Sequence, residues 1–217
     1  MRETVKGCLK SARQAVSVTL VLMLICGLGF PCLLTGLSGV LFPWQAGGSL
    51  VEVDGKVLGA EHVGQEFVSD CYLWSRPSAY HYNVYTEDEN GVRHYLDGSE
   101  FAGLGSGSNN YAATNPQLTE RVEKDLADFL AKNPSVRAEE IPTDLLTASG
   151  SGLDPDISPE AAEIQVPRIA AASGLSEKAV QEIIDRHTSG KLLGIFGEDT
   201  VNVLRVNLDL AQAMGIC

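Results

Sequence analysis

The chain has 217 residues, 44% of them hydrophobic, and a formal net charge of −12, and its length allows one or two domains. The acidic balance argues against nucleic-acid binding, because no excess of cationic side chains is present to neutralise phosphates. Residues 1–14 carry four basic side chains and one acidic one, whereas the rest of the chain carries 12 basic and 27 acidic ones. No charged residue lies between Arg13 and Glu52. This pattern predicts a basic tip, an apolar segment and an acidic domain.

Residues 15–37 form the apolar segment. A helix of these 23 residues is about 34 Å long, and the hydrocarbon core of a membrane is about 30 Å thick. We therefore expect one transmembrane helix, in which Gly27, Gly29 and Pro31 favour a bend or a close helix neighbour. Positive flanks stay in the cytoplasm, so residues 1–14 are expected there and the domain outside, at the cell membrane.

A cleaved signal peptide is the alternative interpretation of this segment. The apolar run is longer than that of a signal peptide, and no Ala-x-Ala cleavage site follows it. Neither Cys26 nor Cys32 follows the small-residue pattern of a lipoprotein. A retained anchor is favoured, and a mature N-terminus near Gly47 would reverse that choice.

The first half of the soluble part is rich in turns. Residues 38–47 are expected to be a junction, and residues 50–58 a small hairpin about a tight Asp-Gly turn. Residues 71–85 are rich in Tyr and Trp and are expected to be extended or strand-like. Within residues 84–103, a polar stretch predicts a surface hairpin or loop, and a loop of Gly, Ser and Asn follows it.

Helices are predicted in the second half. Asn115 caps a helix that a proline begins, and apolar residues recur in it every four positions until an Asn-Pro pair ends it. Ser158 begins a second helix in the same way, and Pro167 is expected to kink or divide it. Ser176 begins a third helix. Residues 201–208 are rich in β-branched side chains and favour a strand, with a short turn after them.

These elements predict an α+β fold. It consists of one N-terminal transmembrane helix followed by a single mixed α/β extracytoplasmic domain, which covers residues 48–217. Cys71 and Cys217 are the two cysteines of that domain. The two thiols can pair outside the cell, but their spacing does not decide whether they do.

Catalytic motifs are missing from the sequence. The phosphorylation motif Asp-Lys-Thr-Gly is absent, and residues 188–191 only approach a Walker A loop, because Leu192 stands where Ser or Thr must bind the metal. The histidines form no helical pair, and no Gly-x-Ser-x-Gly elbow occurs. Asp154, Asp156 and Glu160 can form an ion site, but stabilisation of turns and of a helix start is the favoured interpretation. We expect no catalytic, cofactor-binding or metal-binding residue.

A family resemblance rests on the segment PTDLLTASGSGLDP at residues 142–155, which resembles the signature loop of the KdpC family. Members of that family belong to the Kdp potassium-transporting P-type ATPase complex. Further similar segments are residues 76–79, 107–109, 115–116, 157–162, 165, 168, 187–188, 193–194, 197–198, 201–204 and 207–208. The resemblance covers nearly the whole chain, including the anchor. The chain departs from the family pattern at Ser75, at residues 111–113 and at Pro167, and relative to that pattern residues 84–103 are an insert.

The resemblance implies a non-catalytic accessory subunit of an ATP-driven, high-affinity potassium import complex. Its implied partners are a channel-like potassium-binding subunit, a P-type ATPase subunit and a small membrane subunit. ATP and K⁺ are handled by the complex, so no cofactor of its own is implied. The implied role is to assemble or stabilise the complex, or to gate the access of ions. The alternative function is a membrane-anchored extracytoplasmic binding module for another partner or ligand.

Candidate residues for loop structure or partner contact come from the segments that carry the resemblance. They are Arg76, Asn109, Asn115, Asp144, Ser149, Ser151 and Asp154. Stabilisation of turns within the domain is the competing role for each residue, and for the serines and aspartates it is about as well supported as contact. Arg76 is more open, because a guanidinium can form an ion pair within a domain or across an interface.

Overall fold

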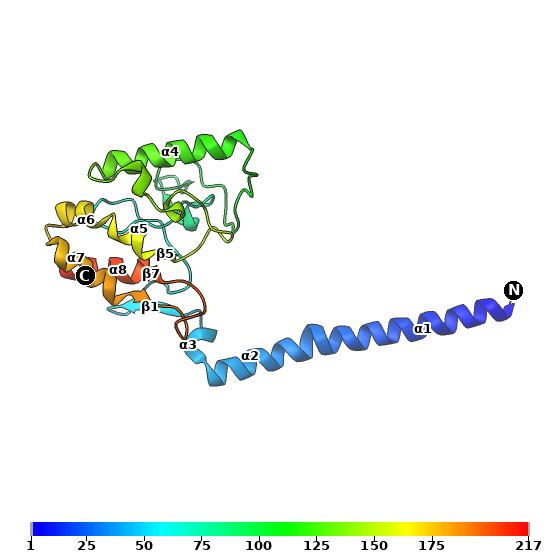
Figure 1. Ribbon diagram of the computed structural model, residues 1–217. Helices are drawn as coiled ribbons and strands as arrows, with labels where there is room; N and C mark the ends of the chain where they lie inside the picture. Colours follow the sequence, from blue (N-terminus) through cyan, green and yellow to red (C-terminus); the bar gives the residue numbers. More distant parts are fainter. Residues whose placement is uncertain (1, 217) are drawn as a thin grey trace. The chain divides into compact units, whose positions relative to one another are not determined.

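A computed structural model describes the backbone of residues 2–216 and the side chains of residues 10–216. The chain divides into two compact units, Met1–Leu50 and Val51–Cys217. The first unit is a long apolar helix, and the second is a mixture of helices and short strands (Figure 1). The fold is therefore a mixed α/β domain that follows one long N-terminal helix.

The N-terminal helix has a defect in its middle. It consists of α1 (Arg2–Leu24), a π-helical turn (Ile25–Gly29) and α2 (Phe30–Leu41). Pro31 follows that turn after one residue, and a proline lacks the N–H that a regular α-helix would use and collides with the carbonyl four residues earlier. A widened turn relieves this conflict, whereas the expected bend or close helix neighbour stays a prediction.

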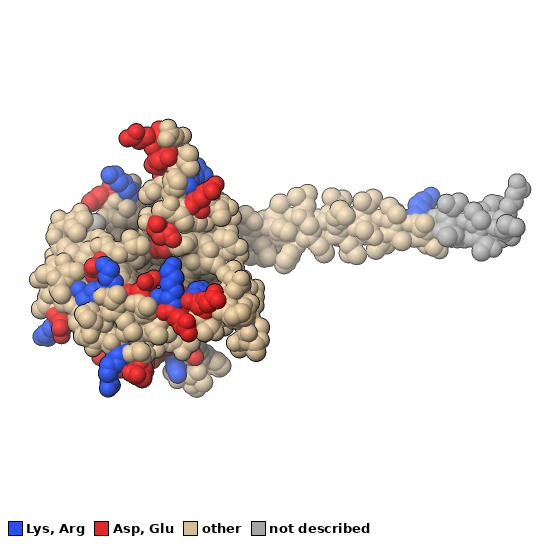
Figure 2. All heavy atoms as spheres, turned by 90° about the horizontal axis from the view of Figure 1, so that it is seen from above, with Lys and Arg blue, Asp and Glu red and all other residues tan. Residues whose placement is uncertain are grey.

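Length and composition make this helix a candidate membrane span. Among the described residues, Lys10–Leu41 is the one helix that is long and apolar enough to cross a membrane. Its surface shows no charged side chain after the basic end (Figure 2). The helix continues past residue 37 into the expected junction, where a four-residue helix, α3 (Pro43–Ala46), follows it.

Two hairpins and several turns form the first half of the domain. The hairpin expected at residues 50–58 is confirmed as β1 (Leu50–Val53) and β2 (Lys56–Ala60). Asp54 and Gly55 between them both have positive φ angles, as the tight turn requires. In the insert, β3 (Thr86–Glu87) pairs antiparallel with β4 (Arg93–His94), which confirms the expected surface hairpin.

The three helices predicted from their caps are confirmed. They are α4 (Pro116–Lys132), α5 (Pro159–Glu163) with its continuation α6 (Val166–Ser173), and α7 (Glu177–Arg186). The Asn115 side chain accepts a hydrogen bond from the backbone N–H of Gln117, and Ser158 and Ser176 cap the other two starts. Pro167 lies in the first turn of α6, so it divides the second helix as expected.

The expected strand at residues 201–208 is wrong over most of its length. Only β7 (Thr200–Asn202) is a strand, and it lies between β5 (Asp156–Ile157) and β6 (Thr188–Ser189) in an antiparallel sheet. Helix α8 (Val203–Ala213) follows at once, because the Asn202 side chain accepts a hydrogen bond from the N–H of Arg205. Burial of one helical face overrides the β propensity of the valines.

The core lies between α5–α8 and the three-stranded sheet. Fully buried members include Ile169, Val180, Val201, Val206 and Leu210. Helix α4 adds Phe129 to this cluster. Leu73, which comes from a segment without regular secondary structure, is also completely buried in it.

The segment around Leu73 is held by side chains and not by a neighbouring strand. Asn207 accepts a hydrogen bond from the Leu73 N–H at 2.7 Å and donates one to the Leu73 carbonyl at 2.9 Å. Gln165 pairs with both backbone groups of Trp74 in the same way. The Arg168 guanidinium donates to the carbonyls of Asp70 and Tyr72. The expected strand-like stretch at residues 71–85 therefore lies outside any sheet in the described chain.

One cysteine of the domain is described. The Cys71 Sγ atom lies 3.2 Å from the Ser69 Oγ atom. Cys217 lies outside the described residues, so a bond between the two cysteines stays an open prediction.

Candidate functional site

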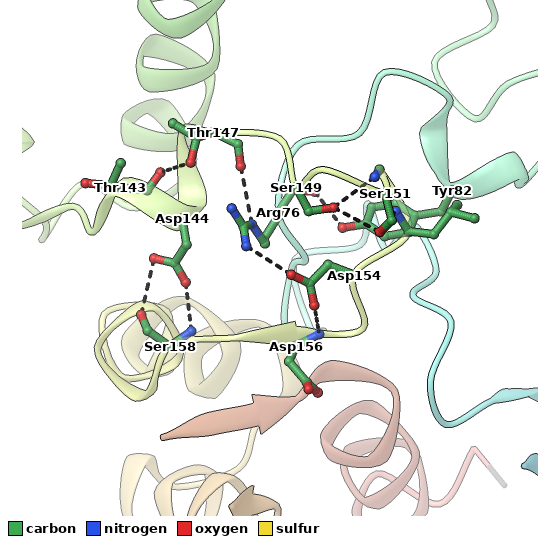
Figure 3. Close-up of polar contacts among 12 residues, drawn as sticks. Arg76, Tyr82, Thr143, Asp144, Thr147, Ser149, Ser151, Asp154, Asp156 and Ser158 are labelled. Atoms are coloured by element: carbon green, nitrogen blue, oxygen red, sulfur yellow. Dashed lines mark hydrogen bonds and ion pairs between the residues drawn. The ribbon is translucent and has the colours of Figure 1, made fainter. Parts of the chain in front are cut away.

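Arg76 joins two loops that are far apart in the sequence (Figure 3). Its Nη1 atom lies 3.0 Å from the Asp154 carboxylate, and its Nε atom donates to the carbonyl of Thr147 at 3.3 Å. The Arg76 and Asp154 side chains are 22% and 30% exposed, so the ion pair is partly shielded from water. These two contacts fix the orientation of the Arg76 guanidinium before any partner binds.

The loop at residues 147–154 is stabilised by its own serines and aspartate. Ser149 Oγ accepts a hydrogen bond from the N–H of Gly152, and Ser151 Oγ accepts one from the N–H of Leu153. The two hydroxyl oxygens lie 3.3 Å apart. Asp154 Oδ1 accepts from the N–H of Asp156, which leaves its other oxygen for Arg76. These side chains fix the backbone, as short polar residues do in turns.

Two further loops are bound to this one. The N–H of Gly107 and the hydroxyl of Ser106 both donate to the carbonyl of Ser151. The Ser78 hydroxyl donates to the carbonyl of Gly152 at 2.7 Å. Residues 76–78, 105–109 and 147–154 thus form one ordered surface, which we call the loop platform.

Asp144 and Asn115 are held at helix starts. The Asp144 carboxylate accepts hydrogen bonds from the backbone N–H and the hydroxyl of Ser158, at 2.7 and 3.2 Å, just before α5 (Figure 3). Asn115 caps α4. These contacts are internal to the domain, and both residues lie outside the loop platform.

Asn109 lies at the edge of the platform, where it lines a cavity of about 480 Å³ together with Arg121 and Lys124 of α4. A second cavity of about 450 Å³ is lined by Arg76, Glu66 and Asp125 among others. Burial raises the pKa of Asp125, although the neighbouring Arg121 opposes the shift. Of the seven candidate residues, the structure therefore brings Arg76, Asn109, Ser149, Ser151 and Asp154 together.

The turn at His81–Asn83 beside the platform has no signal in the sequence. All three residues have positive φ angles, between 46° and 58°, a conformation that is uncommon for residues other than glycine and that strains the bulky Tyr82 most. The Tyr82 hydroxyl donates to the carbonyl of Arg76 at 3.0 Å, and burial raises the Tyr82 pKa. His81 Nδ1 lies 2.7 Å from the Glu66 carboxylate. Through the Tyr82 hydroxyl, this turn holds the backbone of Arg76 in place.

The chemistry of the platform is that of a rigid polar surface. Its one carboxylate, Asp154, pairs with Arg76 and a backbone N–H. The hydroxyls of Ser149 and Ser151 pair with backbone N–H groups. Among the residues that the structure describes, no group of three or more His, Cys, Asp or Glu side chains is placed to hold a metal ion. Such a surface can present fixed hydrogen-bonding groups to another molecule.

A helix of membrane-spanning length followed by a mixed α/β domain with ordered polar loops is the architecture of a single-pass membrane protein. The KdpC family model, described as the c chain of the K⁺-transporting ATPase, matches residues 12–212. The chain therefore belongs to the KdpC family of potassium-transporting ATPase subunits.

Curated relatives carry the same description. The potassium-transporting ATPase KdpC subunit of Clostridium kluyveri is 51% identical over 207 residues, which cover 95% of this chain and 96% of the relative. The subunit of Clostridioides difficile is 50% identical over 209 residues, which cover 96% of this chain and all of the relative. That of Rhodopseudomonas palustris is 46% identical over 202 residues, or 93% and 96% of the two chains.

Proposed function

We propose that the chain assembles and stabilises the potassium import complex by docking its domain, through the loop platform, on the extracytoplasmic face of a channel-like potassium-binding subunit. Membership of the KdpC family supports a role in potassium transport. The observation that carries the docking role is the cross-linking of three distant loops around Arg76 and Asp154. Control over the access of ions to the channel-like subunit would follow from that position.

Pre-ordered loops favour association. A flexible loop loses conformational freedom when it binds, whereas hydrogen bonds to Gly152, Leu153 and Asp156 already fix the platform in the free domain. The anchor adds to this effect, because two proteins held in one membrane meet at a high effective concentration. Weak polar contacts are then sufficient for a stable complex.

The other parts of the proposal concern the rest of the complex. A P-type ATPase subunit and a small membrane subunit are the further partners, and they supply ATP hydrolysis and part of the transmembrane assembly. K⁺ is cargo of the complex. The basic tip supports a topology in which the domain lies across the membrane from the ATP-rich cytoplasm, and that topology argues against direct contact between the domain and ATP.

The proposal is tested with Arg76→Ala in the whole complex. We expect the yield of the other subunits that co-purify with the tagged chain, and potassium uptake at micromolar potassium, to fall at least about tenfold, as removal of a central interface arginine does. The matched control is Arg137→Ala, which removes an ion pair with Glu140 on a surface that is 76% exposed at the arginine. The control is expected to leave both measurements unchanged.

A stability measurement separates docking from folding. The unfolding midpoint of the full chain in detergent is recorded for wild type, Arg76→Ala and Arg76→Lys. Loss of assembly with an unchanged midpoint supports docking by Arg76. Normal assembly and uptake in Arg76→Ala would rule out the contact role. Equal losses of stability and assembly, both restored by lysine, would assign Arg76 to the internal ion pair with Asp154 alone.

A further inference from the structure

Four large apolar side chains project from the loop between β6 and β7. Leu192, Leu193, Ile195 and Phe196 are between 62% and 82% exposed. They follow Lys191, and no acidic residue occurs until Glu198. We call residues 191–196 the apolar tip. A contiguous group of this kind on a soluble surface marks contact with an apolar partner.

The apolar tip is an ordered hairpin. Leu192 and Phe196 exchange backbone hydrogen bonds of 2.8 and 3.0 Å across it, and the N–H of Gly194 donates to the carbonyl of Lys191. At its base the Asp199 carboxylate accepts a hydrogen bond from the N–H of Lys191 at 3.0 Å. The four side chains are thus displayed on a fixed turn.

The conformation of Leu193 is a second, independent observation. Its φ angle is +55°, and that of Gly194 is +73°, as in a tight turn whose two central residues are left-handed. Asn, Asp or Gly suits the first of these positions, whereas leucine is strained there. Strain at an 82% exposed side chain gives no benefit to packing, so it indicates that the side chain acts outside the domain.

The nearby membrane is the surface that fits the tip. The anchor helix ends at Leu41 and β1 begins at Leu50, and the chain between them can reach no more than about 30 Å. Within the domain, the apolar tip and the β1–β2 hairpin lie at the same end, away from α4 (Figure 1). The hairpin adds Val57, which is also exposed. A projecting tip needs no shape-matched groove when its partner is a fluid lipid interface.

We propose that the apolar tip inserts into the lipid interface and so forms a second, non-covalent anchor that orients the domain on the membrane. Leucine, isoleucine and phenylalanine side chains partition into the boundary between headgroups and acyl chains. Lys191 is the one cation of the tip, so the contact depends on apolar burial more than on anionic lipid and changes little with salt. This contact does not require the other subunits of the complex.

The test uses the full chain, alone, in nanodiscs of zwitterionic phosphatidylcholine with brominated acyl chains. Phe196→Trp introduces a fluorescent ring at the tip, and the wild-type chain, with Trp44 and Trp74, is the blank. We expect brominated lipid to quench the added fluorescence at least about twofold more than it quenches Leu104→Trp. Leu104 is the matched control, because it is an isolated apolar residue that is 79% exposed in another loop.

Leu193→Asn tests the strain. Because asparagine fits the left-handed conformation, the unfolding midpoint of the full chain is expected to rise, while lipid quenching of Phe196→Trp in the same chain falls.

Equal quenching of the Phe196→Trp and Leu104→Trp chains, with equal access to aqueous iodide, would overturn the proposal. Shielding that arises only when the other subunits are present would overturn it as well, since a protein surface would then be the partner. A lowered midpoint in Leu193→Asn would refute the strain argument.

Discussion

Asn207 takes the place of a neighbouring strand for Leu73, because its amide satisfies both backbone groups of a fully buried residue. Asn207→Asp keeps the shape and the acceptor, but turns a donor into an oxygen that faces the Leu73 carbonyl. We expect this change to lower the free energy of unfolding by about 2–4 kcal/mol, since a buried pair is lost and a charge is buried. Chemical unfolding of the full chain in detergent measures the difference.

Asn90→Asp serves as the control, because Asn90 lies at the exposed turn of the β3–β4 hairpin. It should change stability by no more than about 0.5 kcal/mol. If the two variants unfold at the same denaturant concentration, the amide of Asn207 is not what holds the segment around Leu73.

The half-buried position of Asp156 predicts that the stability of the folded chain depends on pH. Burial raises its pKa above the ordinary 3.8, the bond from Asn202 opposes this, and the charge of Asp154 adds to it. The folded chain therefore keeps this proton at a pH where the unfolded chain has lost it. This contribution to stability is complete below pH 3.8 and is lost as the pH rises through the folded-state pKa.

Asp156→Asn removes that titration and keeps an acceptor for Asn202. We expect a higher unfolding midpoint than wild type at pH 7, and a difference that shrinks as the pH falls toward 4. Unfolding curves at several pH values measure this, with Glu163→Gln, an exposed position on α5, as the control. A difference that is constant with pH would contradict the assignment.

At the scale of elements, the sequence predicted helix starts and breaks correctly, because short-range interactions determine them. Asn115, Ser158 and Ser176 mark helix starts because a side chain caps the nearest free N–H groups, and Pro167 divides a helix for an equally local reason. The strand prediction failed at residues 203–208, where the burial of one face of α8 outweighs the preference of valine for strands. It also had no means of finding the segment around Leu73, whose hydrogen-bond partners lie on helices 91 to 134 residues away.

The candidate site shows the same limit. Ser149, Ser151 and Asp154 lie in turns, where serine and aspartate carry local signals in the sequence. The pairing of Arg76 with Asp154, and the contact of Gly107 with Ser151, join segments that no periodicity relates. The left-handed turn at His81–Asn83 could not be predicted either, because the sequence His-Tyr-Asn contains no glycine to indicate positive φ angles.

Gly152 tests how tightly two loops of the platform are joined. Its φ angle is +66°, and a Cβ atom there would collide with the carbonyl of Gly107. Gly174 has a similar φ of +76° but open space around it. We expect Gly174→Ala to lower stability by about 1 kcal/mol from backbone strain alone, and Gly152→Ala to lower it at least about twice as much. Equal effects on the unfolding midpoint would mean that the two loops separate easily.

At the scale of the whole molecule, the chain has three features whose proposed roles lie outside its own core. The helix Lys10–Leu41 anchors it, the loop platform presents fixed polar groups, and the apolar tip carries exposed hydrophobic side chains. A domain joined to its anchor at one end only is less restricted in orientation than one that also makes the proposed contacts through the platform and the tip. Docking on an extracytoplasmic partner also requires that the domain lie on the extracytoplasmic side of the membrane.

The orientation is the last prediction. Four basic residues precede the apolar segment at residues 15–37, and the next basic residue, Lys56, follows the end of the helix at Leu41 by 15 positions. Positive charge near the end of a span stays in the cytoplasm, so the domain should lie outside. Alkaline phosphatase, which folds only outside the cytoplasm, should be active when fused after Ile216. Replacing Arg2, Lys6, Lys10 and Arg13 by glutamine should lower that activity several-fold, because the bias that sets orientation is removed, whereas glutamine at Lys178, Lys191 and Arg137 should not. An inactive fusion at normal expression would place the domain in the cytoplasm and would remove the basis for docking on an extracytoplasmic surface.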